Sequence, residues 1–364
     1  PLDNLRRQRL MCIRDSSGTV VKPPQGCRRV AATVLAVAAV SAACSDSGES
    51  ADPAPSAPDL PMGTSVVAEG LDGPTQIVDG PDGSLVVAQL NGPEGEPTGQ
   101  VLELDPESGN RRILLEGLDT PTGVLWLDGH LWVMQRRSLS VARWDGEGDP
   151  ESLRVVLEDL PFNGRSEGTL TALPDGRLLY ETSGSIRDGE VVEGSGVLWV
   201  LHPRPEESAP PATGLKTAAA HAVLGDGSVL TTEIGDNVAD PPPDELHLFD
   251  PLGEDATDAT VPDGGWPDCP PPGQCPGVTG PVAVFPAGST PTGVALIDGR
   301  SYVALFVTGS VVEVDPQGWA QGDGPRSPAT VLEGLEGPHT LLATPDGELL
   351  ISEHLTGRIL SWRP

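Results

Sequence analysis

Six positions along the chain share a regular spacing, and most of them carry side chains that could bind a ligand. Each lies seven residues after the aspartate of an Asp-Gly pair. The residues at these positions are Gln89, Gln135, Thr182, Glu233, Leu305 and Glu353. Five of the six can form hydrogen bonds, and the two carboxylates could ligate a cation. A second set lies where the first strand of each repeat begins, and it includes side chains that can bind an anion or accept a proton. Its members are Thr75, Thr122, Arg165, Lys216, Thr292 and His339.

The spacing comes from a unit that the chain repeats six times. An Asp-Gly pair recurs between hydrophobic runs, and the steps between copies are 46, 47, 51, 72 and 48 residues. The aspartates are Asp82, Asp128, Asp175, Asp226, Asp298 and Asp346. Asp-Gly between short β-rich runs is typical of a hairpin that joins two antiparallel strands. Four copies also contain a preceding Gly-Leu turn, at Gly70, Gly117, Gly214 and Gly334.

We predict an all-β fold, a six-bladed β-propeller made of four-stranded antiparallel blades. Repetition of such a four-strand unit is the sequence signature of a propeller. The last blade ends at Trp362 after its third strand, whereas the first strand, 65–69, has no blade of its own. We therefore expect 65–69 to pair with Arg358–Trp362 and close the ring, which removes an exposed sheet edge.

The same topology puts both sets of polar residues on one face of the ring. The second strands end on the face where the first strands begin, and the Asp-Gly hairpins lie on the opposite face. Both sets are therefore expected to rim the mouth of the central channel, where propellers commonly bind ligands. A simpler interpretation stays open, in which a ring of polar residues only hydrates a narrow channel.

The chain begins with segments that do not belong to this fold. Residues 1–17 resemble a translated library adaptor, and a basic patch then precedes an apolar run over Val30–Ala43. About 14 apolar residues are too few to span a bilayer and suit a signal peptide. The run ends in Val-Ser-Ala-Ala-Cys, which resembles a lipobox and predicts lipidation of Cys44. Cleavage near Ala43 by an ordinary signal peptidase is the alternative.

These patterns divide the chain into three segments. Residues 1–43 hold the adaptor-like stretch and the signal peptide, and residues 44–63 hold the lipidated cysteine and a disordered Ser/Pro/Asp-rich tether. Residues 64–364 form the propeller, with an insertion at 252–280. We expect an exported lipoprotein on the outer face of the membrane in a bacterial cell envelope. It would be a monomer and would meet the membrane only through its lipid anchor.

Cysteine use and charge agree with export. Cys269 and Cys275 lie within the 252–280 insertion, and an oxidising compartment favours a disulfide between them. The net charge of −31 repels nucleic acid, so no nucleic-acid partner is expected. The chain also contains no Walker loop, no Rossmann glycine pattern and no Gly-x-Ser-x-Gly elbow. Nucleotide enzymes and serine hydrolases are therefore not expected.

One stretch of the chain carries a more specific signature. It contains Gly235-Asp236-Asn237, then Pro241-Pro242-Pro243-Asp244-Glu245-Leu246, then Gly265-Trp266-Pro267-Asp268-Cys269, and later Pro291-Thr292-Gly293. This series resembles the soluble PQQ-dependent sugar dehydrogenases, especially the L-sorbosone dehydrogenase-like branch, from about residue 64 to the end. The resemblance implies a PQQ cofactor and a calcium ion that polarises its quinone. By position, Glu233, Gly235 and Asp236 fall on the segment that includes the calcium site, and hard oxygen ligands suit calcium.

The chain departs from that family at the catalytic histidine and at a pair of residues that touches the cofactor. The family's channel-mouth histidine accepts the proton of the sugar's C1 hydroxyl, and it falls where this chain has Arg165. An arginine cannot accept a proton at neutral pH, so Glu167 is the candidate general base there. His339, at the rim, is the other catalytic candidate. The family's Arg-Asn pair is replaced by Lys216-Thr217, and we expect Arg165, Lys216 and Thr292 to bind PQQ or another anionic ligand.

Three classes of function follow. The first is an oxidoreductase of the PQQ-dependent sugar dehydrogenase kind that acts on an aldose or sorbosone, with catalysis reduced or lost because the histidine is missing. The second is a non-catalytic propeller that binds a sugar, an anion or a partner protein. The third is a metal-dependent lactonase like the gluconolactonase propellers, in which Glu233 and Glu353 hold a cation. The Pro-Asn-Gly motif usual in those lactonases is absent.

Overall fold

The structure is a computed structural model that describes residues 59–163, 168–201, 210, 212–235, 241–249, 261–269, 275–319 and 323–364. The chain divides into two compact units, Pro1–Asp59 and Leu60–Pro364. The expectations for the signal peptide and for lipidation of Cys44 lie outside the described residues. All described strands belong to the second unit.

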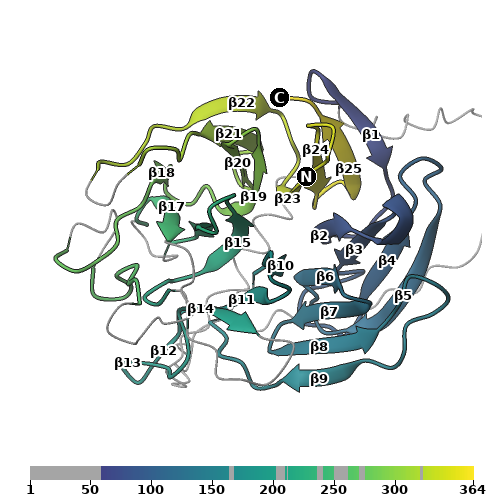
Figure 1. The fold of residues 1–364 in the computed structure, drawn as a ribbon, viewed down its shortest axis with the longest axis horizontal. Coiled ribbons are helices and arrows are strands. Elements are labelled where there is room, and N and C mark those ends of the chain that lie inside the picture. Colours follow the sequence, from purple (N-terminus) through teal and green to yellow (C-terminus); the bar gives the residue numbers. More distant parts are fainter. Residues whose placement is uncertain are drawn as a thin grey trace, which may run out of the picture. The chain divides into compact units, whose positions relative to one another are not determined.

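Six antiparallel sheets stand around a ring in this second unit (Figure 1). We number these sheets as blades 1 to 6 in chain order. Within each blade the strands are given from the innermost to the outermost. Blade 1 comprises β2 (Pro74–Asp79), β3 (Leu85–Gln89), β4 (Gly99–Leu104) and β5 (Arg111–Leu118), with a 3-10 turn, η1 (Pro81–Gly83), between β2 and β3. Blade 2 comprises β6 (Gly123–Leu127), β7 (His130–Gln135), β8 (Ser138–Arg143) and β9 (Arg154–Leu157).

The later blades follow the same order. Blade 4 comprises β15 (Ala218–Val223), β16 (Val229–Glu233), β17 (Asp244–Phe249) and β18 (Ala283–Phe285). Blade 5 comprises β19 (Pro291–Ile297), β20 (Arg300–Leu305), β21 (Ser310–Val314) and β22 (Ala329–Glu333). Blade 6 comprises β23 (Pro338–Ala343), β24 (Leu349–Glu353), β25 (Arg358–Trp362) and β1 (Thr64–Ala68). The predicted six-bladed propeller is therefore confirmed.

Blade 3 is the least regular of the six. It comprises β10 (Thr171–Ala172), β11 (Leu178–Thr182) and β14 (Val197–Leu201), and a small hairpin of β12 (Ile186–Arg187) and β13 (Glu190–Val191) is inserted between the last two. Its outer position is marked by an isolated bridge between Leu198 and Ala212. Of the residues near that bridge, 202–209 and 211 are not described.

The ring closes through the first strand, as predicted. β1 pairs antiparallel with β25, with Thr64 opposite Trp362 and Ser65 opposite Ser361. The strand begins and ends one residue earlier than expected. This pairing covers the edge of the last blade that would otherwise be open to another chain.

The Asp-Gly pairs form the hairpins that set the blade register. In blades 2 and 5 the loop has only two residues, and Asp128 and Asp298 both have φ 50° while Gly129 and Gly299 have φ 71° and 79°. Two consecutive left-handed residues define the type I′ turn, whose twist matches that of the flanking strands. The Asp-Gly sequence is suited to this turn because both residues tolerate a positive φ.

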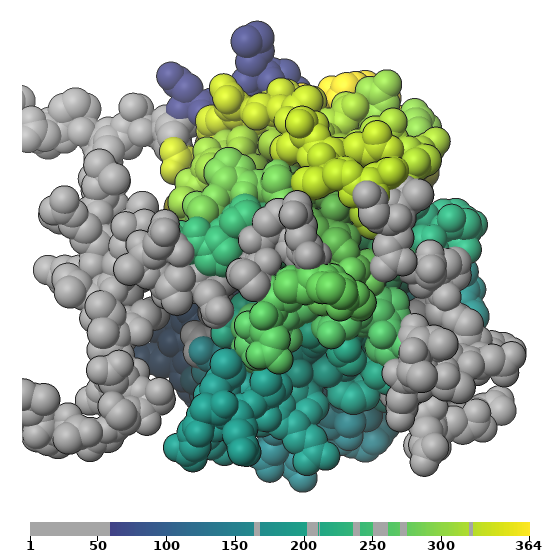
Figure 2. All heavy atoms as spheres, turned by 90° about the vertical axis from the view of Figure 1, so that its left-hand side faces the viewer, coloured from purple at the N-terminus to yellow at the C-terminus, as the bar shows by residue number. Residues whose placement is uncertain are grey.

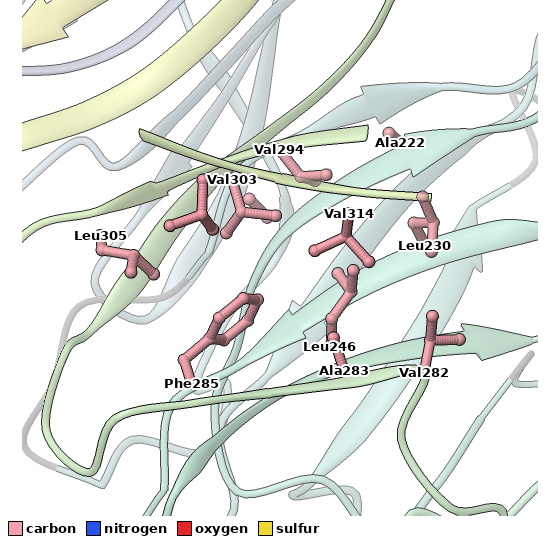
Figure 3. Close-up of a cluster of buried hydrophobic side chains, with 12 residues drawn as sticks. Ala222, Leu230, Leu246, Val282, Ala283, Phe285, Val294, Val303, Leu305 and Val314 are labelled. Atoms are coloured by element: carbon pink, nitrogen blue, oxygen red, sulfur yellow. The ribbon is translucent and has the colours of Figure 1, made fainter. Parts of the chain in front are cut away.

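Aliphatic side chains fill the spaces between blades. Figure 3 shows the cluster between blades 4 and 5, where Leu246 and Phe285 pack with Val303, Leu305 and Val314. Each of these five side chains is at most 3% exposed. Burial of one such side chain contributes about 1.5–3 kcal/mol, so stacked blades can be held together with few aromatic residues.

The predicted disulfide between Cys269 and Cys275 is present. The green segment of the chain that leads toward β18 lies on the outer side of the ring, which faces the viewer in Figure 2. Across the described ranges, no helix has the length and apolar character needed to span a membrane.

Candidate functional site

A cavity of about 430 Å³ occupies the middle of the ring. The inner strands of all six blades form its wall, and the polar residues among its lining include Gln76, Thr169, Thr171, His221 and Thr340. Propellers commonly bind ligands at such a channel, so we describe the predicted site residues relative to it.

Hydrogen bonds between inner strands seal the wall of the channel. Gln76 joins three blades, because its Nε2 donates to the carbonyl of Leu170 at 2.8 Å and its Oε1 accepts the N–H groups of Val124 and Leu170 at 2.7 and 3.0 Å. The hydroxyl of Thr340 donates to the carbonyl of Thr75 and joins blade 6 to blade 1. Gln76 and Thr340 therefore join neighbouring blades as well as lining the cavity.

The six positions after the Asp-Gly pairs end the second strand of their blades in every case. In four blades the side chain there accepts the backbone N–H of the residue that follows the Gly-Leu turn. The pairs are Gln89 with Asp72 at 3.0 Å, Gln135 with Asp119 at 2.9 Å, Glu233 with Lys216 at 2.5 Å and Glu353 with Glu336 at 2.9 Å. We call this contact the turn clamp. It explains why the Gly-Leu turn and the polar strand end recur together.

The turn clamps direct these side chains into their own blades. None of the four clamp side chains is among the described residues that line the cavity. A buried backbone N–H without a partner costs about 1–3 kcal/mol, which is reason enough for a hydrogen-bond acceptor at this position. Polar residues recur at the ends of the second strands, and this recurrence had predicted a polar rim around the channel. The turn clamps explain part of it.

The start of the inner strand carries a recurring β-bulge. The register shifts between Pro74 and Gln76, between Ala218 and Ala220, between Pro291 and Gly293 and between Pro338 and Leu341. Bulges re-aim side chains and are common beside functional sites. Three residues of the predicted rim lie at these bulges: Thr75, Thr292 and His339. In blade 4 the bulge residue is Ala219, and Lys216 lies three residues before it.

Thr292 is used between blades. Its side chain is buried, and its hydroxyl donates to the carbonyl of Pro338 at 3.1 Å. Thr75 makes the same contact between blades 1 and 2, with the carbonyl of Pro121 at 2.8 Å. The predicted cofactor residue Thr292 thus holds blade 5 against blade 6.

Lys216 lies where blade 3 meets blade 4. Its Nζ donates to the carbonyl of Gly184 at 3.1 Å and stands 5.0 Å from the ring centroid of Trp266. This is a cation–π arrangement, which orients the ammonium. The indole Nε1 of Trp266 is buried without a hydrogen-bond partner. The ammonium over the ring is a donor that suits an anionic ligand, and the indole N–H is a second donor on the same side chain cluster.

Of the predicted metal ligands, Glu233 and Gly235 are described. One carboxylate oxygen of Glu233 forms the turn clamp, and the other lies 2.9 Å from Nε2 of His247. The N–H of Gly235 donates to Asp244 at 2.9 Å. Asp236, Arg165 and Glu167 lie outside the described residues.

His339 belongs to a small aromatic cluster that includes His354 and Phe306. The ring of His339 lies 5.6 Å from that of His354 and meets Phe306 edge-on at 6.0 Å, measured between centroids. The His339 side chain is only partly exposed, and its Nδ1 is buried without a hydrogen-bond partner. Burial, together with the neighbouring His354, lowers the pKa of His339 to about 3. Its imidazole is therefore neutral at pH 7, but a pKa this low gives it little affinity for a proton in the absence of a ligand.

Two residues that were not predicted as site residues lie beside Glu233. Glu245 is directly opposite Glu233 on the neighbouring strand, and His247 follows two residues later on the same face of the sheet. Nε2 of His247 is 2.9 Å from Glu233 and 3.5 Å from Glu245. The sequence Asp-Glu-Leu-His at 244–247 could have indicated a cluster of ligating side chains. It could not show that Glu245 lies opposite Glu233 on the preceding strand.

The pKa values in this cluster are strongly perturbed. Burial alone would lower the pKa of His247, but its contacts with Glu233 and Glu245 raise it to about 10. Burial is the main cause that raises the pKa of Glu245. The exposed fraction is 6% for Glu233, 3% for Glu245 and 0% for His247, so solvent does not screen their charges.

Comparisons with known proteins place the fold. The PQQ-bound aldose sugar dehydrogenase of Streptomyces coelicolor matches with a TM-score of 0.66 and 19% identity, over 84% of this chain and 99% of that chain. The calcium structure of a Trichoderma reesei protein of the carbohydrate-active family AA12 matches with a TM-score of 0.67 and 16% identity, over 84% of this chain and 96% of that chain. A putative gluconolactonase matches less well, with a TM-score of 0.54 and 14% identity, over 82% and 90%.

No protein-family model and no curated protein matches the sequence at a significant level. The structural neighbours include soluble PQQ-dependent sugar dehydrogenases with a six-bladed propeller, as the motifs had suggested. At these identities the agreement concerns the fold, and the same fold carries more than one chemistry.

Proposed function

We propose that this protein is an oxidoreductase of the PQQ-dependent sugar dehydrogenase kind. The observation that carries the proposal is His339, a neutral imidazole with an unpartnered buried nitrogen at the bulge that starts the inner strand of blade 6. It would replace the missing histidine as proton acceptor once a negatively charged ligand beside it raises its pKa toward the working pH. The motifs from Gly235 to Cys269 and the neighbour that binds PQQ support the same class.

The residues near Trp266 fit an anionic, flat cofactor. Lys216 supplies a cation over the indole ring, and Nε1 of Trp266 is a buried donor without a partner. PQQ carries carboxylates and accepts a hydride when bound. Lys216 would hold one of these carboxylates, Arg165 would hold another, and Thr292 would act indirectly by fixing blade 5 against blade 6.

The predicted calcium ligands fit a calcium ion less completely than the residues near Trp266 fit PQQ. Both carboxylate oxygens of Glu233 already have neighbours, in Lys216 and His247, so Glu233 is turned into its blade. A calcium ion at the mouth would therefore take oxygens of Gly235 and Asp236. In this proposal His339 removes the hydroxyl proton of the sugar, and Glu167 is the alternative base.

We also propose that the protein is exported and anchored by a lipid on Cys44. The apolar run before that cysteine and the disulfide between Cys269 and Cys275 support this location. Its sugar substrate or anionic ligand would then be extracytoplasmic.

A second candidate is a propeller that binds a sugar or an anion without turnover. It is favoured by the internal use of two predicted site residues, since Thr292 bonds to Pro338 and Glu233 to Lys216. The two candidates make different predictions for the same experiment.

The experiment is a titration of the purified protein with PQQ in the presence of Ca²⁺, followed through the absorbance of the quinone. Addition of an aldose and an electron-accepting dye then tests turnover. The first candidate predicts saturable binding that Lys216→Met weakens at least tenfold, followed by reduction of the dye. Sugar or PQQ binding without reduction supports the second candidate. Absence of both PQQ binding and dye reduction overturns the first.

A further inference from the structure

The buried Glu233–Glu245–His247 cluster in blade 4 differs from the equivalent position in other blades. In blade 1, Gln89 stands opposite Gln100, and its Nε2 donates to Gln100 at 2.9 Å. In blade 6, Glu353 stands opposite Arg358, whose Nε donates to it at 2.6 Å. The turn clamp is therefore neutral in blade 1 and charge-balanced in blade 6.

Blade 4 has a carboxylate on both strands at this position. Glu233 and Glu245 are directly opposite, and like charges in that arrangement destabilise a sheet. Both are nearly inaccessible to solvent, at 6% and 3% exposed. An uncompensated buried charge costs several kcal/mol, so a cation held between the two carboxylates would stabilise this pair.

The polar atoms of the cluster also lack the partners that buried groups normally have. Oε2 of Glu233, Oε1 of Glu245 and both ring nitrogens of His247 have no hydrogen-bond partner. The 2.9 Å contact between Nε2 of His247 and Glu233 is close but is not directed as a hydrogen bond. His247 is completely buried, and its Nε2 faces the two carboxylates.

The spacing of these atoms suits a metal ion. One ligand atom from each residue lies within 4.8 Å of the other two. In a tetrahedral site with bonds of about 2.0–2.1 Å, ligand atoms are about 3.3–3.4 Å apart. The separations of 2.9 and 3.5 Å from Nε2 of His247 bracket that value.

We infer that Glu233, Glu245 and His247 form a buried site for a divalent transition-metal ion, with zinc as the best match. Two carboxylates balance the charge of a 2+ ion, and the ion would displace the proton of His247 when the imidazole ligates it. Nitrogen ligation favours zinc over calcium, which prefers oxygen ligands. The site is distinct from the proposed calcium position, which takes oxygens of Gly235 and Asp236.

The metal would act on Lys216 through Glu233. The other oxygen of Glu233 clamps the N–H of Lys216, and Lys216 in turn contacts Gly184 of blade 3 and the ring of Trp266. A metal ion that fixes the Glu233 carboxylate therefore fixes the turn that positions Lys216. We assign these three ligands a positioning role and not a catalytic one.

The test measures metal content in the absence of PQQ and sugar, so its failure is separate from failure of the proposed oxidoreductase function. The purified protein is stripped with a chelator, incubated with Zn²⁺ in excess Ca²⁺, and passed over a desalting column. The expected result is one zinc ion per chain, a higher melting temperature, and zinc binding at least tenfold weaker after Glu245→Gln or His247→Gln. His221→Asn is the matched control, because it removes another buried histidine of the same blade and should retain the zinc.

A second measurement avoids variants that could fail to fold. The X-ray absorption spectrum of zinc bound to the wild-type protein should show a shell of oxygen ligands with one imidazole. No retained zinc would overturn the inference. So would retention that is unchanged in the His247→Gln protein, or a zinc shell without imidazole.

Discussion

Glu353 and Arg358 form a buried ion pair across β24 and β25, with Nε of Arg358 donating to Oε2 of Glu353 at 2.6 Å. Glu353 is fully buried and Arg358 is 6% exposed. The other oxygen of Glu353 accepts the N–H of Glu336 and so holds the turn into blade 6. This blade also carries β1, so the pair lies in the sheet that closes the ring.

Replacing Arg358 with leucine should lower the free energy of unfolding by about 3–5 kcal/mol, because Glu353 would remain buried as an uncompensated charge. The measurement is urea denaturation. The double variant Glu353→Gln with Arg358→Leu should recover most of the loss, since the glutamine still accepts the N–H of Glu336. Equal losses in the single and double variants would contradict this account.

The turn clamp in blade 1 should matter for stability by a smaller amount. Gln89→Leu leaves the N–H of Asp72 without its acceptor and should lower the free energy of unfolding by about 1–3 kcal/mol. Gln89→Glu keeps an acceptor for that N–H and serves as the control for the loss of the clamp. A leucine variant as stable as the wild type would show that the clamp has no energetic role.

His221 should give the protein a specific loss of stability in acid. Burial lowers the pKa of His221 to about 3, whereas an unfolded histidine titrates near 6.5. Between these values the unfolded state binds more protons, so the free energy of unfolding falls as the pH falls. Relative to His221→Asn, the wild type should lose up to about 1.4 kcal/mol per pH unit in this window. Parallel curves for the two proteins from pH 6.5 to pH 3.5 would contradict the assignment.

The disulfide should contribute modestly, because the loop that it closes is short. Cys269 and Cys275 are six residues apart in sequence, and the chain-entropy relation gives about 2 kcal/mol for such a loop. Replacing both cysteines with serine should lower the free energy of unfolding by up to that amount. The measurement is thermal denaturation of the oxidised wild type beside the double serine variant. A loss well above 3 kcal/mol would mean that the bridge holds more than its own loop.

The fold could be predicted closely because its signals are local. Asp128-Gly129 and Asp298-Gly299 specify two-residue turns, and the strand ends seven residues later follow from the hairpin register. Ring closure followed from counting strands, since β1 had no other partner. Blade 3 differs because its hairpin β12–β13 interrupts the repeat.

The candidate site was harder to predict because the direction of a side chain depends on its neighbours. Glu233 was placed correctly at a strand end, but its carboxylate turns to Lys216 and His247 and not to the cavity. Thr292 was expected at the rim and holds Pro338 instead. The pairing of Glu233 with Glu245 joins two neighbouring strands, and no repeat in the sequence specifies that register.

The most direct test of the proposed function is the kcat for dye reduction with an aldose, measured with PQQ and Ca²⁺ for the wild type, His339→Asn and His130→Asn. His130 is exposed on a hairpin and serves as the control. We predict turnover by the wild type and by His130→Asn, and a kcat lower by about 10²–10⁴ in His339→Asn with PQQ binding retained. Turnover that is unchanged in His339→Asn, or absent in the wild type, would contradict the account.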